Sequence, residues 1–93
     1  MIAGFRDPDA ELLWLTGKSR RIPAGLRKAA FRKLAVLNAA LEPANLRVSP
    51  GNRLEKLSGD RSGQYSIRIN NQFRICFRWH DGNAYDVEIV DYH

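Results

Sequence analysis

The last three residues of the chain, Asp91, Tyr92 and His93, place a carboxylate, a phenol and an imidazole directly after a run of alternating apolar residues. An imidazole can act as a general acid or base, and metal-free RNA cleavage uses such groups to activate a 2′-hydroxyl and protonate the leaving oxygen. The other histidine, His80, belongs to a predicted hairpin on the order of 25 Å from His93, so the two cannot act together. Spacing alone favours a simpler interpretation, in which the last residues are a frayed terminus.

A pair of arginines is the second feature that could do chemistry. The register of two predicted strands places Arg68 directly across from Arg74, where like charges are unfavourable by about a few tenths of a kcal/mol. An arginine pair without a stabilising role suggests a site for an anion such as a phosphate. The alternative is that Asp86 and Glu88, on the neighbouring strand, neutralise the two arginines diagonally.

The composition is that of one small folded domain, which we expect to span residues 1–93. Hydrophobic residues make up 44% of the 93 residues and charged residues 27%, a mix that excludes a disordered chain. The formal net charge of +5 favours polyanionic partners or an acidic protein partner, although many basic domains are merely soluble. The charge alone does not decide between these partners, so the placement of the basic residues must decide.

The sequence gives no sign of a membrane, a disulfide or a metal. Its apolar stretches are shorter than the roughly 20 residues of a membrane span, and its first residues lack the order of a signal peptide. The single cysteine, Cys76, cannot form an internal disulfide, and no Cys or His cluster has the spacing of metal ligands. We expect a cytoplasmic protein without metal, cofactor or membrane contact.

Two helices are predicted in the first half of the chain, after a short opening strand over residues 2–5. Asp7 and Pro8 form the start of the first helix, which contains Leu12, Leu13 and Leu15 and ends at Gly17. A basic loop over residues 18–22 leads to Pro23, where the second helix opens.

The second helix carries one apolar stripe, formed by Leu26, Ala30, Leu34, Leu37 and Leu41. Its basic residues lie largely off that stripe, which indicates a solvated face or a surface for an acidic partner segment. These residues are Arg27, Lys28, Arg32 and Lys33.

Strands are predicted in the second half, after an irregular connection over residues 42–50 with two prolines. Residues 53–57 form a short candidate strand, residues 58–63 a loop, and the chain after Gln64 alternates with a period of two residues. This pattern predicts three antiparallel strands with one buried face. The expected fold is α+β, with a short N-terminal strand and two helices on one face of a three- to four-stranded antiparallel sheet.

The alternation also predicts how the strands pair. Apolar residues oppose one another only if Ile69 faces Phe73 across a three-residue loop. In the second hairpin the same logic pairs Trp79 with Tyr85, through an odd-numbered loop or bulge around residues 81–83. A plain two-residue Asp-Gly turn would instead place Phe77 opposite the charged residue 86.

Long segments of the chain closely resemble the HigB toxins of bacterial toxin–antitoxin pairs, which belong to the RelE/ParE superfamily. The matching segments cover residues 52–57, 59–61, 64–70, 74–77 and 85–93. The resemblance spans nearly the whole chain and is strongest after Pro50. It implies a RelE/ParE-like fold and a ribosome-dependent endoribonuclease that enters the decoding site, cuts the messenger and stops growth.

The resemblance also implies an active site. In such toxins the terminal Asp-Tyr-His lines the site together with an arginine matching Arg74. The resemblance thus implies that His93 is the general acid or base and that Asp91 orients it or fixes the tail. Tyr92 would stack on a base, and Arg74 would stabilise charge at the scissile phosphate. Attack by the 2′-hydroxyl would need no metal. The residues expected to bind RNA are Arg53, Lys56, Arg61, Arg68 and Arg78.

One position departs from the family pattern. Members commonly have a lysine immediately before the Gly59-Asp60 pair, where this chain has Ser58. Lys56, expected on the same strand face, could substitute with its ammonium displaced. This departure puts the rate of cleavage in doubt and allows a weak toxin.

Partners and alternatives follow from the same resemblance. It implies a HigA-like helix-turn-helix antitoxin, a ribosome and messenger as targets, and operator DNA bound by the toxin–antitoxin complex. One alternative is a non-catalytic inhibitor that binds gyrase, as the ParE branch does, because a fold alone does not decide function. Another is a weak toxin that acts mainly as a co-repressor with its antitoxin.

Overall fold

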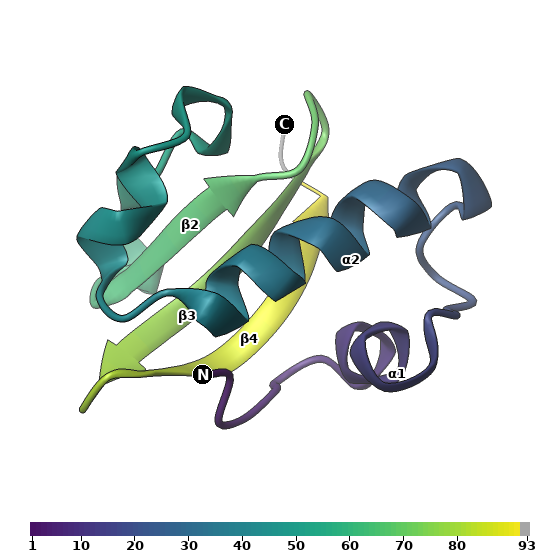
Figure 1. The fold of residues 1–93 in the computed structure, drawn as a ribbon, viewed down its shortest axis with the longest axis horizontal. Helices are drawn as coiled ribbons and strands as arrows, with labels where there is room; N and C mark the ends of the chain where they lie inside the picture. Colours follow the sequence, from purple (N-terminus) through teal and green to yellow (C-terminus); the bar gives the residue numbers. More distant parts are fainter. Residues whose placement is uncertain (92–93) are drawn as a thin grey trace.

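Two helices lie on one face of a four-stranded antiparallel sheet in the computed structural model, which describes residues 1–91 (Figure 1). The helices are α1 (Pro8–Thr16) and α2 (Ala24–Ala39). The strands lie in the order in which they occur in the chain and are β1 (Glu55–Lys56), β2 (Gln64–Arg68), β3 (Phe73–His80) and β4 (Asn83–Asp91). The predicted α+β architecture is confirmed.

Helix α1 begins and ends where the local signals predict. The Oδ1 atom of Asp7 accepts a hydrogen bond from the backbone N–H of Asp9 at 3.0 Å, and Pro8 occupies the first turn. Gly17 has a φ of 76°, and its N–H donates to the carbonyl of Leu13 at 2.8 Å. Only one of the three predicted leucines, Leu13, is fully buried.

Helix α2 follows its predicted stripe until its last turn. Ala30, Leu34 and Leu37 are fully buried, but Leu41 is 83% exposed, so its place in the stripe was wrong. The backbone becomes extended at Ala40, one residue after the helix ends, and the helical period no longer applies beyond it. Ala40 itself is buried and closes the stripe.

The connection between α2 and the sheet is more regular than predicted. It forms two 3₁₀ helices, η1 (Pro43–Arg47) and η2 (Pro50–Asn52), each with a proline in its first turn, where the missing N–H is not needed. The buried Asn52 side chain donates to the carbonyl of Leu46 at 3.1 Å and accepts a hydrogen bond from Lys33. A third 3₁₀ helix, η3 (Gly59–Arg61), lies in the predicted loop before β2.

The first hairpin has the predicted register. Arg68 pairs with Arg74, and the loop between β2 and β3 leaves Ile69 facing Phe73. The Oδ1 atom of Asn70 accepts from the backbone N–H of Phe73 at 2.7 Å and so closes the turn.

The second hairpin differs from the prediction. Trp79 pairs with Ala84, and Asp81 and Gly82 form a two-residue turn with φ values of 49° and 80°. A turn with positive φ at both positions matches the twist of the strands, so it displaces the predicted odd-numbered loop. As a result Tyr85 pairs with Arg78 and lies on the face of the sheet away from the helices.

A bulge inside β4 restores the burial pattern that the turn would otherwise disrupt. The register shifts between Cys76 and Arg78 of β3, and on the opposite strand Asp86 takes a φ of 51°. Beyond this bulge Ile75 pairs with Ile89, and both are buried. The predicted bulge therefore exists but lies several residues from the turn.

The predicted opening strand is reduced to two isolated parallel bridges with β4. Ile2 bridges to Ala84 and Phe5 to Val87, with the β4 bulge lying between these two contacts. Because the bulge interrupts the ladder, no continuous strand forms over residues 2–5.

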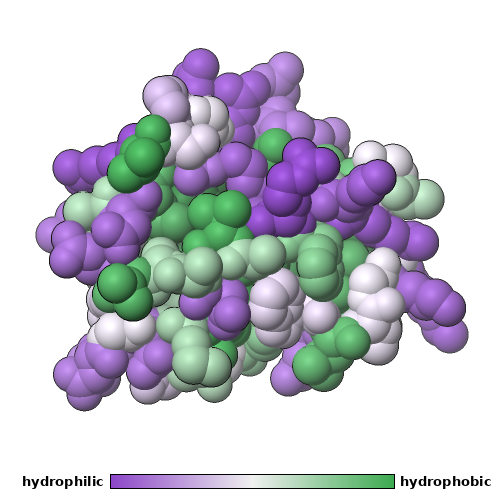
Figure 2. All heavy atoms as spheres, viewed as in Figure 1, coloured by the Kyte–Doolittle hydropathy of each residue, from purple (hydrophilic) through white to green (hydrophobic). Residues whose placement is uncertain are grey.

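The core lies between the two helices and the inner face of the sheet. Its fully buried side chains include Leu13, Ile22, Leu34, Leu37, Leu46, Ile67, Ile75, Phe77 and Val87. On the helix side, apolar atoms reach the surface at several points among hydrophilic side chains (Figure 2). In the part of the chain that the structure describes, no helix has the length and apolar character to cross a bilayer.

Candidate functional site

An open polar cleft of about 350 Å³ lies on the outer face of the sheet, the face away from the helices. It sits where β2 ends, β3 begins and β1 runs alongside. Its lining contains three guanidinium groups and one carboxylate, and consists of Arg53, Glu55, Arg68, Asn70, Asn71 and Arg74. Such a lining can bind a phosphate group through charge-assisted hydrogen bonds.

Arg74 is the most firmly held of the three arginines. Its residue is 8% exposed; its Nε donates to the Ser66 hydroxyl at 2.8 Å and its Nη2 to the Arg53 carbonyl at 2.7 Å. The Glu55 carboxylate lies 3.8 Å from Nη2. The guanidinium is thus oriented before any ligand arrives, which is the preorganisation that stabilises developing charge.

Arg53 reaches the cleft through an unusual backbone conformation. It has a φ of 44° and a ψ of 57°, the left-handed region that a residue with Cβ rarely adopts. This conformation costs about 1 kcal/mol or more and is offset in part by the hydrogen bond that its carbonyl accepts from Arg74. Strain of this kind concentrates at functional sites.

The like-charge pair predicted from the alternation is present, with Arg68 directly opposite Arg74 on the outer face. Arg68, the last residue of β2, donates to the Asn71 side chain in the loop that follows. The acids proposed as diagonal partners form ion pairs elsewhere on this face: Asp86 lies 3.5 Å from Arg78.

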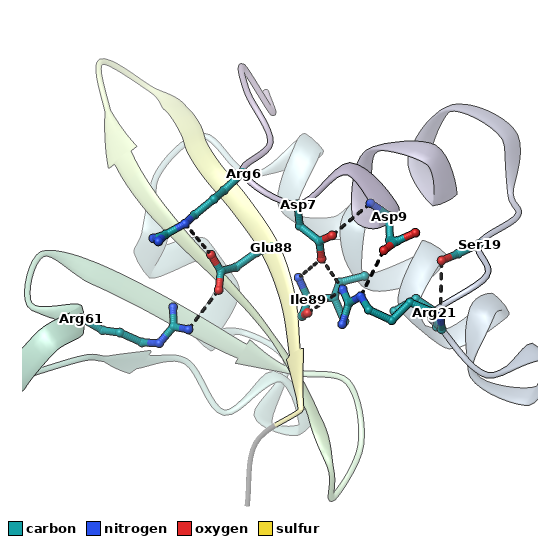
Figure 3. A network of polar contacts seen from close by, with 9 residues as sticks. Arg6, Asp7, Asp9, Ser19, Arg21, Arg61, Glu88 and Ile89 are labelled. Carbon is teal, nitrogen blue, oxygen red and sulfur yellow. Dashed lines mark hydrogen bonds and ion pairs between the residues drawn. The ribbon is translucent and has the colours of Figure 1, made fainter.

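Glu88 is held between two other arginines. Its Oε1 accepts from Arg61 at 3.0 Å and its Oε2 lies 3.4 Å from Arg6 (Figure 3). Arg61 also donates to Gln64 at 3.2 Å. The two acids therefore neutralise Arg61 and Arg78, and not the Arg68–Arg74 pair of the cleft as the alternative had proposed.

The five residues predicted to bind RNA are thus divided by the structure. Arg53 and Arg68 join Arg74 in the cleft lining, whereas Arg61 and Arg78 lie outside it, and each forms an ion pair with an acid. Lys56 pairs with Tyr65, whose ring packs against the core, so the register assigns it to the opposite face from Glu55. It is exposed but does not line the cleft.

The predicted catalytic cluster is described only in part. Asp91 ends β4 opposite Phe73, the residue before Arg74, and its Oδ2 accepts a hydrogen bond from the Gln72 side chain at 3.1 Å. Tyr92 and His93 lie outside the described residues. The antiparallel pairing nevertheless brings the end of β4 beside the strand that carries Arg74.

A polar network holds β4 two residues before Asp91 (Figure 3). Arg21, in the loop between the helices, donates through Nη2 to the Ile89 carbonyl at 2.9 Å and forms ion pairs with Asp7 and Asp9. The Ile89 N–H donates to the Asp7 carboxylate at 3.3 Å. One carboxylate thus caps α1 and fixes the last part of the sheet.

The outer face is not open along its whole length. Ser66 and Cys76 are fully buried there, and the Ser66 hydroxyl accepts its hydrogen bond from Arg74. Burial, opposed by the nearby Arg61, raises the pKa of the Cys76 thiol, which therefore stays neutral. Within residues 1–91, no group of His, Cys, Asp and Glu side chains comes together in a way that could hold a metal ion.

Sequence reasoning missed several residues of this site. Glu55, Asn70 and Asn71 were interpreted only as strand or turn residues, and Gln72 as a loop residue. The polar composition of the loop over residues 70–72 was a usable signal, because an Asn-Asn-Gln run beside an arginine pair offers hydrogen-bonding groups to a ligand. The link between Asp7 and Arg21 had no signal beyond opposite charge.

The sequence of this chain is similar to those of known toxins. Residues 3–93 match the family model described as the RelE-like toxin of the type II toxin–antitoxin system HigB. Toxin HigB-1 of Vibrio cholerae is 44% identical over 85 residues, covering 90% of each chain. Endoribonuclease HigB of Proteus vulgaris is 31% identical over 93 residues, covering 100% of each.

Solved structures support the same assignment at the level of the fold. The YoeB–YefM toxin–antitoxin complex from Staphylococcus aureus contains a chain with a TM-score of 0.61 and 20% identity, with 100% of this chain and 98% of that chain covered. Together with the family model and the two relatives, this likeness confirms the predicted resemblance: the chain belongs to the HigB-like toxins, the RelE-like toxins of type II toxin–antitoxin systems.

Proposed function

We propose that this toxin is a metal-free endoribonuclease that cleaves messenger RNA in the decoding site of a translating ribosome. The observation that carries the proposal is the convergence of Arg53, Arg68 and Arg74 on one cleft whose lining holds a single carboxylate. The name of the Proteus vulgaris relative, an endoribonuclease, supports the same activity.

The cleft suits an RNA phosphodiester at the point of cleavage. The three guanidinium groups neutralise the phosphate, and the fixed Arg74 donates to the oxygens on which charge develops. The adjacent 2′-oxygen gives its proton to a base and bonds to phosphorus, while the bond to the 5′-oxygen breaks and that oxygen takes a proton. The products are a 2′,3′-cyclic phosphate and a free 5′-hydroxyl.

We assign the remaining roles to the end of the chain. His93 is the general acid or base, and Tyr92 stacks on a base of the messenger. Asp91 anchors this segment through its hydrogen bond to Gln72. Since Lys56 does not line the cleft, Arg53 and Arg68 are the basic residues that compensate for the lysine replaced by Ser58.

The activity is tested by sequencing messenger 5′ ends after brief induction of the toxin. The natural protein should produce new ends within translated regions, and Arg74→Ala or His93→Ala should abolish both the ends and the growth arrest. Arg32→Ala is the control, because Arg32 is an exposed residue of α2 that does not line the cleft. Growth arrest that survives both active-site substitutions would favour a non-catalytic inhibitor.

The dependence on the ribosome needs its own test. Purified toxin should cut a messenger only when that messenger is being translated, and efficient cleavage of the same RNA free in solution would contradict the decoding-site proposal.

We further propose a helix-turn-helix antitoxin as partner, with operator DNA bound by the complex. The structural neighbours are chains of toxin–antitoxin complexes, which supports an antitoxin partner for this fold. Co-purification of the toxin with the product of the adjacent gene, followed by a gel-shift experiment on the promoter, tests both statements. A complex that fails to shift the promoter would remove the operator from the proposal.

A further inference from the structure

A groove on the helix side of the molecule has no role in the cleavage chemistry. It consists of two adjoining hollows of about 590 Å³ and 440 Å³, which share Arg27 and lie between the end of α1 and the first turns of α2. We call it the helical groove. The residues used below are its apolar members, Leu12 and Phe31, and its basic members, Lys18, Arg20, Arg27 and Lys28.

The apolar part of the helical groove is exposed and preformed. Leu12 is 43% exposed and Phe31 is 40% exposed, although both are large apolar side chains. The Phe31 ring packs against Trp14 with 5.2 Å between ring centroids, which holds it in place. Such a surface gains free energy when a partner covers it, and it needs little rearrangement to accept one.

The charged residues that line the helical groove all have the same sign. They are two lysines and two arginines, with no Asp or Glu in either hollow. Arg27 is fixed at the boundary between the hollows, because its Nε donates to the Ile22 carbonyl at 3.1 Å. Helix α1 has two acids, Asp9 and Glu11, and neither lines the groove; Asp9 forms an ion pair with Arg21 at the start of the helix.

Position separates the helical groove from the cleft. The helices cover the inner face of the sheet (Figure 1), and the groove lies on these helices, whereas the cleft opens on the outer face. In Figure 2, which views the helix side, apolar patches are interrupted by hydrophilic side chains. An apolar floor with a basic rim is complementary to a segment that has one apolar face and acidic flanks.

We propose that the helical groove is the docking surface for an acidic, amphipathic segment of the antitoxin. The inference rests on the proposed antitoxin partner but not on the proposed cleavage activity. Leu12 and Phe31 supply the apolar contact, and the basic rim selects an acidic chain and speeds its association.

The test measures the affinity of the purified toxin for the antitoxin encoded beside it, by calorimetry. Leu12→Asp should weaken binding on the order of tenfold or more, because it puts a charge into the apolar contact. Lys28→Glu should weaken it by slowing association, and the affinity of the natural toxin should fall as salt rises. Lys28 is an exposed residue and Leu12 lies outside the buried core, so both variants should remain folded, which a thermal unfolding scan checks.

Matched controls carry the same changes outside the groove. Leu41→Asp and Val48→Asp replace apolar residues that are 83% and 84% exposed, and Arg32→Glu reverses a charge on α2 away from the lining. These three should bind the antitoxin within about twofold of the natural protein. Groove variants that bind as tightly as the controls would overturn the proposal.

Growth experiments keep this result apart from the proposed cleavage. Leu12→Asp should still arrest growth when expressed alone but should no longer be rescued by co-expressed antitoxin. A toxin that cuts no messenger would end the cleavage proposal and leave the binding result intact. Full rescue of the Leu12→Asp variant would instead contradict the docking surface.

Discussion

The cleft on the outer face and the helical groove are both rich in arginine or lysine, yet they are built for different ligands. The cleft combines its cations with amide groups and a carboxylate, and the Arg74 guanidinium is held by hydrogen bonds. The groove combines its cations with exposed leucine and phenylalanine. The net charge of +5 therefore does not predict what each basic region binds, because the neighbouring side chains decide the ligand of each cation.

We expect the largest effect from Arg74→Lys, which should lower the cleavage rate of the cleft and leave the binding of the groove unchanged. Lysine keeps the charge but cannot donate to both the Ser66 hydroxyl and the Arg53 carbonyl in the same fixed geometry. Single-turnover cleavage on programmed ribosomes should fall on the order of a hundredfold. Antitoxin affinity should stay unchanged.

Arg78→Lys is the control for that experiment, since Arg78 pairs with Asp86 outside the cleft and should retain most of the cleavage rate. A parallel loss of antitoxin affinity in Arg74→Lys would mean that the cleft and the groove are coupled.

A smaller effect is expected from Arg53, where charge and strain can be separated. Arg53→Gly removes a guanidinium and places a residue suited to positive φ at that position. The affinity for the uncleaved messenger should fall about tenfold, and the slope of log binding constant against log salt concentration should decrease in magnitude by roughly 0.7. The free energy of unfolding should rise by up to about 1 kcal/mol, because the backbone strain is relieved. Filter binding and urea denaturation measure the two quantities.

Arg53→Ala makes the distinction complete. It removes the same charge but keeps a Cβ in the left-handed region, so it should weaken RNA binding equally without the gain in stability. RNA affinity that is unaffected by either substitution would remove Arg53 from the proposed site.

Substitution of Asp7 tests how the helices that form the groove are joined to β4, the strand that leads to the end of the chain. Asp7→Ala removes the cap of α1, the acceptor for the Ile89 N–H and a partner of Arg21, so stability should fall by about 1–2 kcal/mol in urea denaturation. Asp9→Ala loses only a half-exposed ion pair and should change stability by less than about 0.5 kcal/mol. Equal effects of the two substitutions would contradict the role assigned to Asp7.

The smallest effect concerns Cys76, buried beneath the outer face. Its pKa is raised by burial in the folded state, so the stability contributed by the neutral thiol is complete below the unfolded pKa of about 8.5 and is lost as pH rises through the folded value. The natural protein should therefore lose stability in this alkaline window relative to Cys76→Ala, as measured by urea denaturation. Parallel pH profiles would show that the thiol is open to solvent.

Much of the fold could be predicted because its signals are local. The cap at Asp7, the left-handed end at Gly17 and the pairing of Arg68 with Arg74 each depend on a few neighbouring residues or on the parity of one short loop. The second hairpin could not be predicted in the same way. The alternation of apolar residues required one extra residue between the buried positions of β3 and β4. The geometry of the two-residue turn decided that this residue is Asp86 and does not lie beside the turn.

By itself the sequence determined the two helices, the period of the strands, the face on which the arginines lie and, through its resemblance, the family. Only the tertiary structure decided which arginines share a cleft, because Arg53 enters through a strained turn and Arg61 is drawn away by Glu88. It also joined Arg21 to Ile89, residues 68 positions apart in the chain. Local propensities act over a few residues, whereas such contacts depend on how packed elements bring distant side chains together.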